Sequence, residues 1–387
     1  MLGLGSSITS GVPESKYSIS LGGTDDYVDL GNVHNLGTGD FSFSFWVKAS
    51  DTTTNFLFTK YEDGSNYYYI RFQGSDKIQF RTKVGGVEIM NLVCTTAVNA
   101  GEFNHIVITC DRSNSTTGLK YYLNGNYINQ GAASATDIDN TGDFNIGKYG
   151  STYAEAGTIL DEVAVFNVAL VSGAVTDIYN LGSPINLTFD QGNHLSATVQ
   201  GYYKMGDGSF DDKANGVIHD QDNPGFGAEK ITNGDFTAAG TLGDTTYSLG
   251  WGRNGAGSDV SISGGELILF NSSGSANDGR IYATNSVSEN FNVITSGKFY
   301  RLTYTISQVS GGTPDLQYHT GGSYVDFTAS QQTVGTHTKF YKATGSIFLL
   351  RQQAAGVTVK VSNVSLVELN GKPGLTSGGP TFSSDTP

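Results

Sequence analysis

The chain has 387 residues, among them 52 Gly and only 7 Pro, and it carries a formal net charge of −14. This length exceeds the usual size of one domain and predicts two domains of about 150 residues each. The 22 Lys and Arg residues form no basic stripe, which argues against nucleic acid and anionic membranes as partners.

Residues 16–182 contain a series of short strand-like runs. In these runs apolar and polar residues alternate or aromatic residues follow one another, and clusters of Gly, Asn, Asp and Ser separate them. One short helix is predicted over 172–179, with Val175 and Ile178 packing on the sandwich. Many short strands without long helices predict a β-sandwich. The clearest runs are FSFSFWVKA, NFLFTKY, YYYIRF, KIQFRT, HIVITC, LKYYLN and DEVAVF.

The remainder of the chain predicts a second domain after a connector. Residues 183–230 have a looser pattern, and strand-like runs resume over 231–369 with ELILF, GKFYRLTYTISQ and VTVKVSNVSLVEL. The two ends, 1–15 and 370–387, have the composition of extended arms. The predicted fold is therefore all-β, with two consecutive β-sandwich domains between two arms.

Neither a signal peptide nor membrane insertion is expected. The N-terminus has no basic region followed by an apolar one, and no run of about 18 apolar residues occurs. Cys94 and Cys110 lie in apolar runs rather than in a metal or redox spacing. Two buried thiols are expected, and a disulfide between neighbouring strands is the alternative.

The chain contains no recognisable catalytic motif. HExxH, GxSxG and GxGxxG are absent, and the six His residues are dispersed. Glycosidases need two carboxylates at a controlled separation. The closest acidic pair, Asp161 and Glu162, is expected to point to opposite faces of a strand. We therefore predict a protein that is not an enzyme and has no catalytic residues.

One acidic loop is a candidate calcium site. Asp137, Asp139 and Asp143 place carboxylates at alternate positions around a Gly turn, and oxygen atoms are the ligands that Ca²⁺ prefers. A structural Ca²⁺ is the only cofactor that the sequence suggests. The alternative is an ordinary solvated acidic turn.

Four aromatic residues are candidate carbohydrate-binding residues. Sugar rings have apolar C–H faces that stack on Tyr and Trp, while neighbouring amides and carboxylates bond the hydroxyl groups. The alternative for each residue is a place in a sandwich core, which is the expectation for Trp46. The four candidates are Trp251, Tyr282, Tyr318 and Tyr324.

Residues 18–180 resemble the laminin-G-like, concanavalin A-like lectin/glucanase superfamily. The resemblance rests on SISLGGTDDYVDLG, DFSFSFWVKA, FNHIVITCDRSNSTTGLKYYLNGNYI and LDEVAVFNVALVSGAVTDIYNLG, which follow one another in the order of that family's motifs. It implies a jelly-roll sandwich. Members of the family often bind calcium and glycans at rim loops.

Residues 231–369 resemble carbohydrate-binding modules of families 4 and 9. ITNGDF opens the segment, Gly250-Trp251 follows, and VKVSNVSLVEL fits the closing strand. This resemblance implies a second jelly roll that binds a saccharide.

The segment GYYKMGDGSFDDKANGVIHDQDNPGFG lies between the two modules, and NGKPGLTSGGPTFSSDTP follows the second one. With these segments, the layout of the whole chain resembles virion proteins of marine tailed bacteriophages, particularly cyanophages. The resemblance implies a capsid decoration, a fibre subunit or a tail-fibre adhesin that is assembled in the host cytoplasm. Its partners would be other virion proteins, further copies of the chain and a host-surface glycan, and the two arms would dock on the particle. A bacterial carbohydrate-binding protein is the alternative, and a polysaccharide hydrolase or lyase is a second rival.

Overall fold

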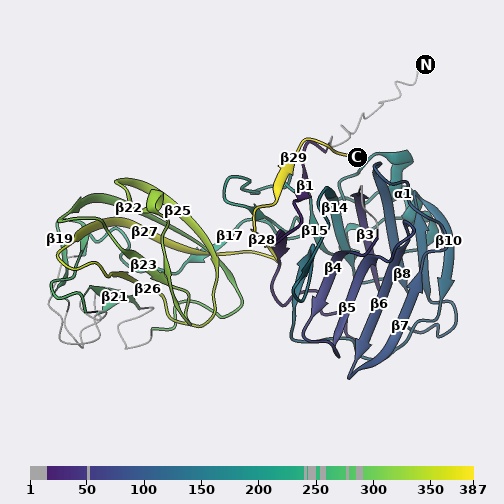
Figure 1. The fold of residues 1–387 in the computed structure, drawn as a ribbon, viewed down its shortest axis with the longest axis horizontal. Helices are drawn as coiled ribbons and strands as arrows, with labels where there is room; N and C mark the ends of the chain where they lie inside the picture. The colour runs from purple at the N-terminus through teal and green to yellow at the C-terminus, as the bar shows by residue number, and fades with distance from the viewer. Residues whose placement is uncertain are drawn as a thin grey trace, which may run out of the picture. The chain divides into compact units, whose positions relative to one another are not determined.

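The computed structural model describes residues 15–49, 53–238, 242, 250–252, 259–275, 279–284 and 291–387. Its contacts divide the chain into unit 1, Met1–Gly225 with Gly371–Pro387, and unit 2, Phe226–Asn370. Each unit is built from β-sheets, and the described residues contain a single short α-helix (Figure 1). The predicted all-β fold with two sandwich domains is confirmed.

Unit 1 contains two large sheets, A and B, whose neighbouring strands pair antiparallel. The described strands of sheet A, in spatial order, are β10 (Asn126–Gly131), β9 (Leu119–Leu123), β8 (Asn104–Cys110), β3 (Phe41–Lys48), β14 (Thr158–Phe166), β1 (Ser18–Leu21) and β29 (Thr381–Ser383), with β15 (Val199–Tyr203) also paired to β14. Those of sheet B are β16 (Val217–Ile218), β28 (Gly374–Ser377), β2 (Tyr27–Asp29), β11 (Asp143–Ile146), β4 (Asn55–Tyr61), β5 (Tyr67–Phe72), β6 (Ile78–Val84) and β7 (Val87–Val93). A separate hairpin joins β12 (Lys148–Tyr149) to β13 (Thr152–Tyr153).

The main core of unit 1 is an aromatic and aliphatic cluster. Alternate residues of β3 enter it, namely Phe41, Phe43 and Phe45, and the ring centroids of Phe45 and Phe58 lie 4.7 Å apart. This alternation is the period of two that a strand imposes on its side chains. Cys94 and Cys110 are both free and buried in the same cluster, which confirms the prediction of buried thiols.

A second apolar cluster covers the other face of sheet A. The helix α1 (Ser172–Tyr179) has the predicted bounds and buries Val175 and Ile178, as expected. Ile185, Leu187 and Tyr202 are buried in the same cluster. Residues 183–225 therefore belong to unit 1, whereas the sequence suggested a connector with local structure over 183–230. The 3₁₀ turns η1 (Asn180–Gly182) and η2 (Ser196–Thr198) lie in this region.

The C-terminal segment forms strands of unit 1 rather than a separate arm. Strand β28 pairs with β2, and β29 pairs with β1. The Asp385 carboxylate lies 2.6 Å from the Lys48 ammonium, and Thr386 donates a hydrogen bond to the Ser15 carbonyl. These contacts hold the C-terminal residues against Ser15 and against Lys48 of β3. The predicted N-terminal arm, 1–15, lies outside the described residues except for Ser15.

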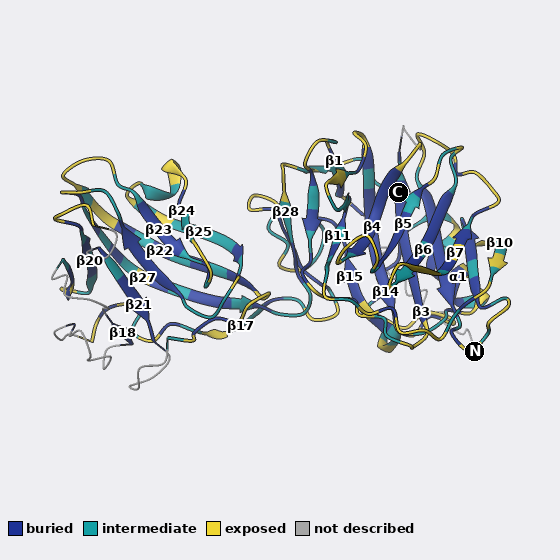
Figure 2. Cartoon of the chain, turned by 60° about the horizontal axis from the view of Figure 1, so that its bottom comes forward, coloured by how far each residue is buried: buried dark blue, intermediate teal, exposed yellow. Residues whose placement is uncertain are grey.

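Unit 2 also consists of two sheets, E and F. The described strands of sheet E are β19 (Val260–Ser263), β20 (Glu266–Phe270), β27 (Thr358–Leu369), β22 (Phe299–Ser310) and β25 (Gly335–Lys342), with β17 (Phe226–Glu229) paired to β27. Those of sheet F are β18 (Trp251–Gly252), β21 (Arg280–Ala283), β26 (Leu349–Gln352), β23 (Leu316–His319) and β24 (Tyr324–Asp326), and the turn η3 (Ala329–Gln332) follows β24. One core, to which Trp251, Tyr304 and Leu366 belong, is built from strands of both sheets, and buried residues alternate with less buried ones along β20 and β27 (Figure 2).

Candidate functional site

Two of the four predicted carbohydrate-binding residues are core residues. Trp251 has 0% exposure, and its indole N–H donates a 3.1 Å hydrogen bond to the Asn233 carbonyl. Tyr318 has 2% exposure, with ring centroids 4.9 Å from Phe327 and 5.1 Å from Tyr341. A ring enclosed in this way has no face left for a sugar, so the prediction was wrong for both residues. Their strands place them on the inward side of sheet F.

Tyr282 and Tyr324 lie on the outward side of the same sheet. Tyr318 points inward and pairs with Val325, so Tyr324, the next residue along β24, points outward. The Arg351 guanidinium lies 3.5 Å from the Tyr324 ring centroid, and its Nε donates a 2.9 Å hydrogen bond to Gln317. Tyr282 is only 9% exposed, and the Arg351 guanidinium covers the Tyr324 ring. The carbohydrate-binding role of the two tyrosines remains a prediction.

A larger surface of the same type lies on sheet B of unit 1. In β5, Tyr68 and Ile70 belong to the core. Because side chains alternate along a strand, Tyr67, Tyr69 and Arg71 point to the opposite face. The sequence analysis did not select these residues, although the alternation in YYYIRF and KIQFRT already distinguishes the two faces. We call this surface the sheet B face, and it consists of Phe56, Tyr67, Tyr69, Arg71, Gln79, Arg81 and Asn91.

Strand register arranges the sheet B face in rows. Because neighbouring antiparallel strands place paired residues side by side, each row brings an aromatic ring next to polar groups. One row consists of Phe56, Arg71 and Gln79, and the next consists of Tyr69, Arg81 and Asn91.

Ring contacts hold the aromatic half of the sheet B face in place. Tyr149, from the hairpin of β12 and β13, stacks on Phe56 with ring centroids 4.5 Å apart. Phe56 meets Tyr69 edge-on at 5.3 Å, and the Arg71 guanidinium lies 5.0 Å from the Tyr69 ring. The three buried rings, Phe56, Tyr67 and Tyr69, form a small cluster of their own. Burial raises the pKa of Tyr149 to about 12, so its hydroxyl group is neutral at pH 7.

Hydrogen bonds fix the polar half. Arg71 donates to Gln79 at 2.8 Å, and Gln79 donates to Asn91 at 2.8 Å. The Arg81 guanidinium lies 2.6 Å from the Glu88 carboxylate. Asn91 and Glu88 are exposed at the rim. The sheet B face thus combines apolar rings with charged and amide groups whose positions are set before any ligand arrives.

A buried carboxylate pair forms a second polar site in unit 1. Leu160 and Val163 both enter the core, whereas a regular strand would send them to opposite faces. The register between β14 and β3 shifts between Asp161 and Ala164, and Glu162 has a φ of 49°. This β-bulge turns both carboxylates away from the core. The expectation that they point to opposite faces was therefore wrong.

The two carboxylates are held by groups from distant parts of the chain. Ser15 donates a 2.5 Å hydrogen bond to Asp161. Glu162 accepts a hydrogen bond from the Tyr202 hydroxyl and lies 4.0 Å from the Lys204 ammonium. Burial raises the pKa of Glu162 to about 7, and burial together with the neighbouring Glu162 charge raises the pKa of Asp161. Glu162 is therefore a group that titrates near neutral pH.

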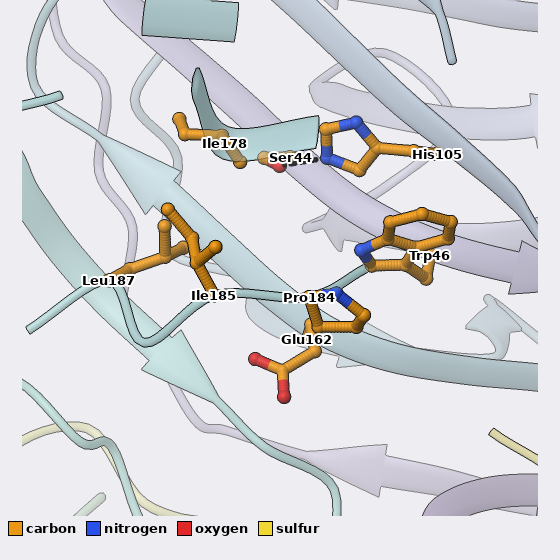
Figure 3. Close-up of a pocket in the computed structure, with 8 residues that line it drawn as sticks. All are labelled: Ser44, Trp46, His105, Glu162, Ile178, Pro184, Ile185 and Leu187. Atoms are coloured by element: carbon orange, nitrogen blue, oxygen red, sulfur yellow. Dashed lines mark hydrogen bonds between the residues drawn. The ribbon is translucent and has the colours of Figure 1, made fainter. Parts of the chain in front are cut away.

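A small cavity lies between this pair and α1. Its polar lining includes Ser44, His105 and Glu162, and the Glu162 carboxylate points away from His105 (Figure 3). Ser44 and His105 are 2.9 Å apart, and burial lowers the pKa of His105 to about 3. The cavity volume is about 10 Å³, which holds at most one water molecule. A sugar ring has no room beside these groups.

Two of the three predicted calcium ligands accept hydrogen bonds from backbone N–H groups. Asp139 accepts a 2.6 Å hydrogen bond from the Gly37 N–H, and Asp137 accepts one from the Asp139 N–H. Asp143 begins β11. Within the described part of the chain, no three His, Cys, Asp or Glu side chains are grouped as metal ligands. Calcium at this loop remains a prediction. In that same part, no helix is long and apolar enough to cross a membrane.

Comparison with known proteins gives one family match and several distant structural likenesses. No curated protein matches the chain. A pentraxin from Limulus polyphemus is similar at 13% identity and a TM-score of 0.35, over 43% of this chain and 82% of its own. The CBM40 module of the Ruminococcus gnavus IT-sialidase, bound to α2,3-sialyllactose, is similar at 16% identity and a TM-score of 0.36, over 44% of this chain and 100% of its own.

The family match lies in unit 1. Residues 22–176 match the laminin G model of the concanavalin A-like lectin/glucanases superfamily. The predicted resemblances to carbohydrate-binding families 4 and 9 and to phage virion proteins remain predictions. Residues 22–176 of this chain are thus similar to laminin-G-type, concanavalin A-like lectin domains.

Proposed function

We propose that this protein is a non-enzymatic glycan-binding protein and that the sheet B face contacts the glycan. The observation that carries the proposal is the pairing of the Phe56, Tyr67 and Tyr69 cluster with the Arg71, Gln79 and Asn91 network on one face of a lectin-type domain. An apolar surface beside positioned polar groups is the usual composition of a carbohydrate site.

The glycan would lie along the rows of the sheet B face. The exposed amide of Asn91 and the half-buried Arg81 guanidinium meet sugar hydroxyl groups. The half-buried ring of Tyr149, which stacks on the buried Phe56, offers a C–H contact at the edge of the sheet B face. The polar groups already bond to one another, so binding costs little side-chain ordering.

A paired substitution tests this surface. In Arg81→Ala/Asn91→Ala, we expect at least a tenfold weaker signal on a glycan array and in calorimetry with the best glycan. Asn126→Ala is the matched control, because Asn126 is also exposed but lies on β10 of sheet A. Equal binding by all three proteins would rule out the sheet B face as the glycan site.

The absence of catalysis is part of the proposal. The buried acid pair is its strongest rival, since Asp161 and Glu162 share one side of β14 and Glu162 has a raised pKa. The neighbouring cavity of about 10 Å³ supports a structural role, because a polysaccharide cannot reach the carboxylates. Release of reducing sugar from algal or bacterial polysaccharides that is lost in Glu162→Gln would establish an enzyme instead.

We further propose that the protein belongs to the surface of a bacteriophage virion, together with other virion proteins and further copies of itself. The resemblance of the layout of two consecutive sandwiches to phage virion proteins supports this role, and the lectin-like domain fits a host-surface glycan as the ligand. The lectin domain fits a bacterial carbohydrate-binding protein equally well. Imaging of phage particles with an antibody to this chain separates the two: labelled particles support the virion role, and unlabelled particles refute it.

A further inference from the structure

A surface cavity of about 240 Å³ lies in the part of unit 1 that follows the lectin domain. Its lining comes from three short segments: Thr188, the η2 turn with the start of β15, and the turn after β16. All of these residues lie beyond 22–176, the range that matches the family model. The cavity is therefore a feature of the additional segment. Its lining residues are Thr188, Ser196, Ala197, Val199, Gln221 and Asp222.

The polar groups of this cavity are mainly hydrogen-bond acceptors. The Thr188 hydroxyl donates its proton to Asn186 at 2.8 Å, and the Ser196 hydroxyl donates to Asp190 at 2.7 Å. Both hydroxyl oxygens therefore keep lone pairs for a ligand. The exposed Asp222 carboxylate accepts no hydrogen bond from the described residues.

The fourth polar side chain, Gln221, is fixed in place. Its amide N–H groups donate to the carbonyls of Ser209 and His219, and its carbonyl accepts from the Ser209 N–H at 2.7 Å. Gln221 therefore shapes one wall and does not reorganise when a ligand enters.

Apolar groups complete the cavity and its surroundings. Val199 is buried and Ala197 is small, so together they provide an apolar wall. Phe189 directly follows Thr188 and is 67% exposed, and Leu195 directly precedes Ser196 and is 53% exposed. Exposed apolar side chains next to polar acceptors suit a ligand with C–H faces and hydroxyl groups.

Size and charge narrow the ligand class. Sites for drug-sized ligands measure about 300 to 1,000 Å³, so a cavity slightly smaller than this range takes one sugar ring. Asp222 is the one charged residue in the lining, and no Lys or Arg lines the cavity. A carboxylate repels anionic sugars and accepts hydrogen bonds from neutral ones.

We propose that this cavity is a second saccharide site, which takes one neutral, uncharged sugar ring whose hydroxyl groups donate to Asp222, Thr188 and Ser196. The inference rests on the proposed glycan-binding function, but it uses none of the residues of the sheet B face. The chain would then hold an extended glycan at one place and a single ring at another.

The test uses the full chain and ligand-observed NMR with the methyl glycosides of glucose, galactose, mannose and glucuronic acid. We expect saturable binding of at least one neutral glycoside with a Kd of about 1 mM, and at least tenfold weaker binding of the glucuronide. In Ala197→Trp, which fills the cavity from an exposed position, this binding should fall at least tenfold, and in Asp222→Asn it should also weaken. Asp25→Asn, in the exposed turn between β1 and β2, is the matched control.

The experiments distinguish a wrong assignment of the second saccharide site from a wrong assignment of the sheet B face as the glycan site. Arg81→Ala/Asn91→Ala should lose array binding and keep the glycoside signal, while Ala197→Trp should do the reverse. Glycoside binding that persists in a folded Ala197→Trp protein, with an unchanged melting temperature, would overturn the second site. So would the absence of any neutral glycoside signal from the wild type at about 10 mM.

Discussion

Replacement of Glu162 by Gln should change how the stability of unit 1 depends on pH. The ordinary pKa of a Glu carboxyl is 4.5, and burial in unit 1 raises that of Glu162 to about 7. Below pH 4.5 the carboxyl group is protonated in both the folded and the unfolded chain. As the pH rises from 4.5 to 7, the unfolded chain loses this proton while the folded chain keeps it, so the free energy of unfolding falls.

The size of the effect follows from the two pKa values. A pKa difference between 4.5 and about 7 corresponds to about 3 kcal/mol, since each tenfold change in an ionisation constant is worth about 1.4 kcal/mol. His105 acts in the opposite direction, because its buried imidazole has a pKa of about 3 and stays neutral. The total pH dependence of the wild type therefore mixes several groups, and the difference between wild type and Glu162→Gln reports on Glu162 together with its electrostatic effect on Asp161.

Urea unfolding followed by tryptophan fluorescence measures this difference. The chain has two Trp residues, Trp46 in unit 1 and Trp251 in unit 2, so a Trp251→Phe background reports on unit 1 alone. Between pH 4 and pH 8, we expect Glu162→Gln to gain about 3 kcal/mol relative to wild type. Glu155→Gln, an exposed neighbour, should show no such gain. A Glu162→Gln difference that stays constant within about 0.5 kcal/mol over this range would refute the assignment.

Three further predictions concern the core and the chain ends. Trp251→Ala should destabilise unit 2 by about 3 to 5 kcal/mol, because the indole is fully buried, and calorimetry of the full chain should show only one of two transitions shifted. Removal of residues 374–387 should lower the melting temperature of unit 1 by about 5 °C or more, since β28 and β29 are lost; an unchanged transition would contradict their role in the sheets. Cys94 and Cys110 should react with a thiol reagent only after unfolding, because both are buried and burial raises the pKa of Cys110 to about 12; fast labelling of the native protein would disprove this.

Much of the fold could be predicted from the order of residues along each strand. The alternation in FSFSFWVKA sends all three Phe residues, which stand at every second position, into the core. The helix over Ser172–Tyr179 begins and ends where the pattern indicated. These are local properties, since the period of a strand or helix acts over a few residues. The same local alternation would have selected Tyr67, Tyr69 and Arg71 for the sheet B face.

The candidate site was less predictable, because the faces of a sheet are decided by pairing. Trp251 and Tyr282 both looked like sugar-contacting residues in the sequence, but the register of β18 and β21 places the first in the core. At Asp161 and Glu162, one extra residue in β14 reversed the expected orientation. This bulge arises from pairing with β3, which is more than 100 residues away in the sequence. The pattern of neighbouring residues therefore does not predict it.

The sequence by itself determined that this protein is all-β and divided into two sandwiches, because strand periodicity depends on the order of residues along the chain. The order of motifs also indicated the similarity of residues 22–176 to lectin domains. Only the tertiary structure decided where the polar segments belong. The sequence suggested a connector over 183–230 and an arm over 370–387, yet residues 183–225 and 371–387 are part of unit 1. These segments stabilise unit 1 through backbone pairing with β1 and β2 and through scattered apolar contacts. Such contacts become favourable only when the distant strands are already assembled.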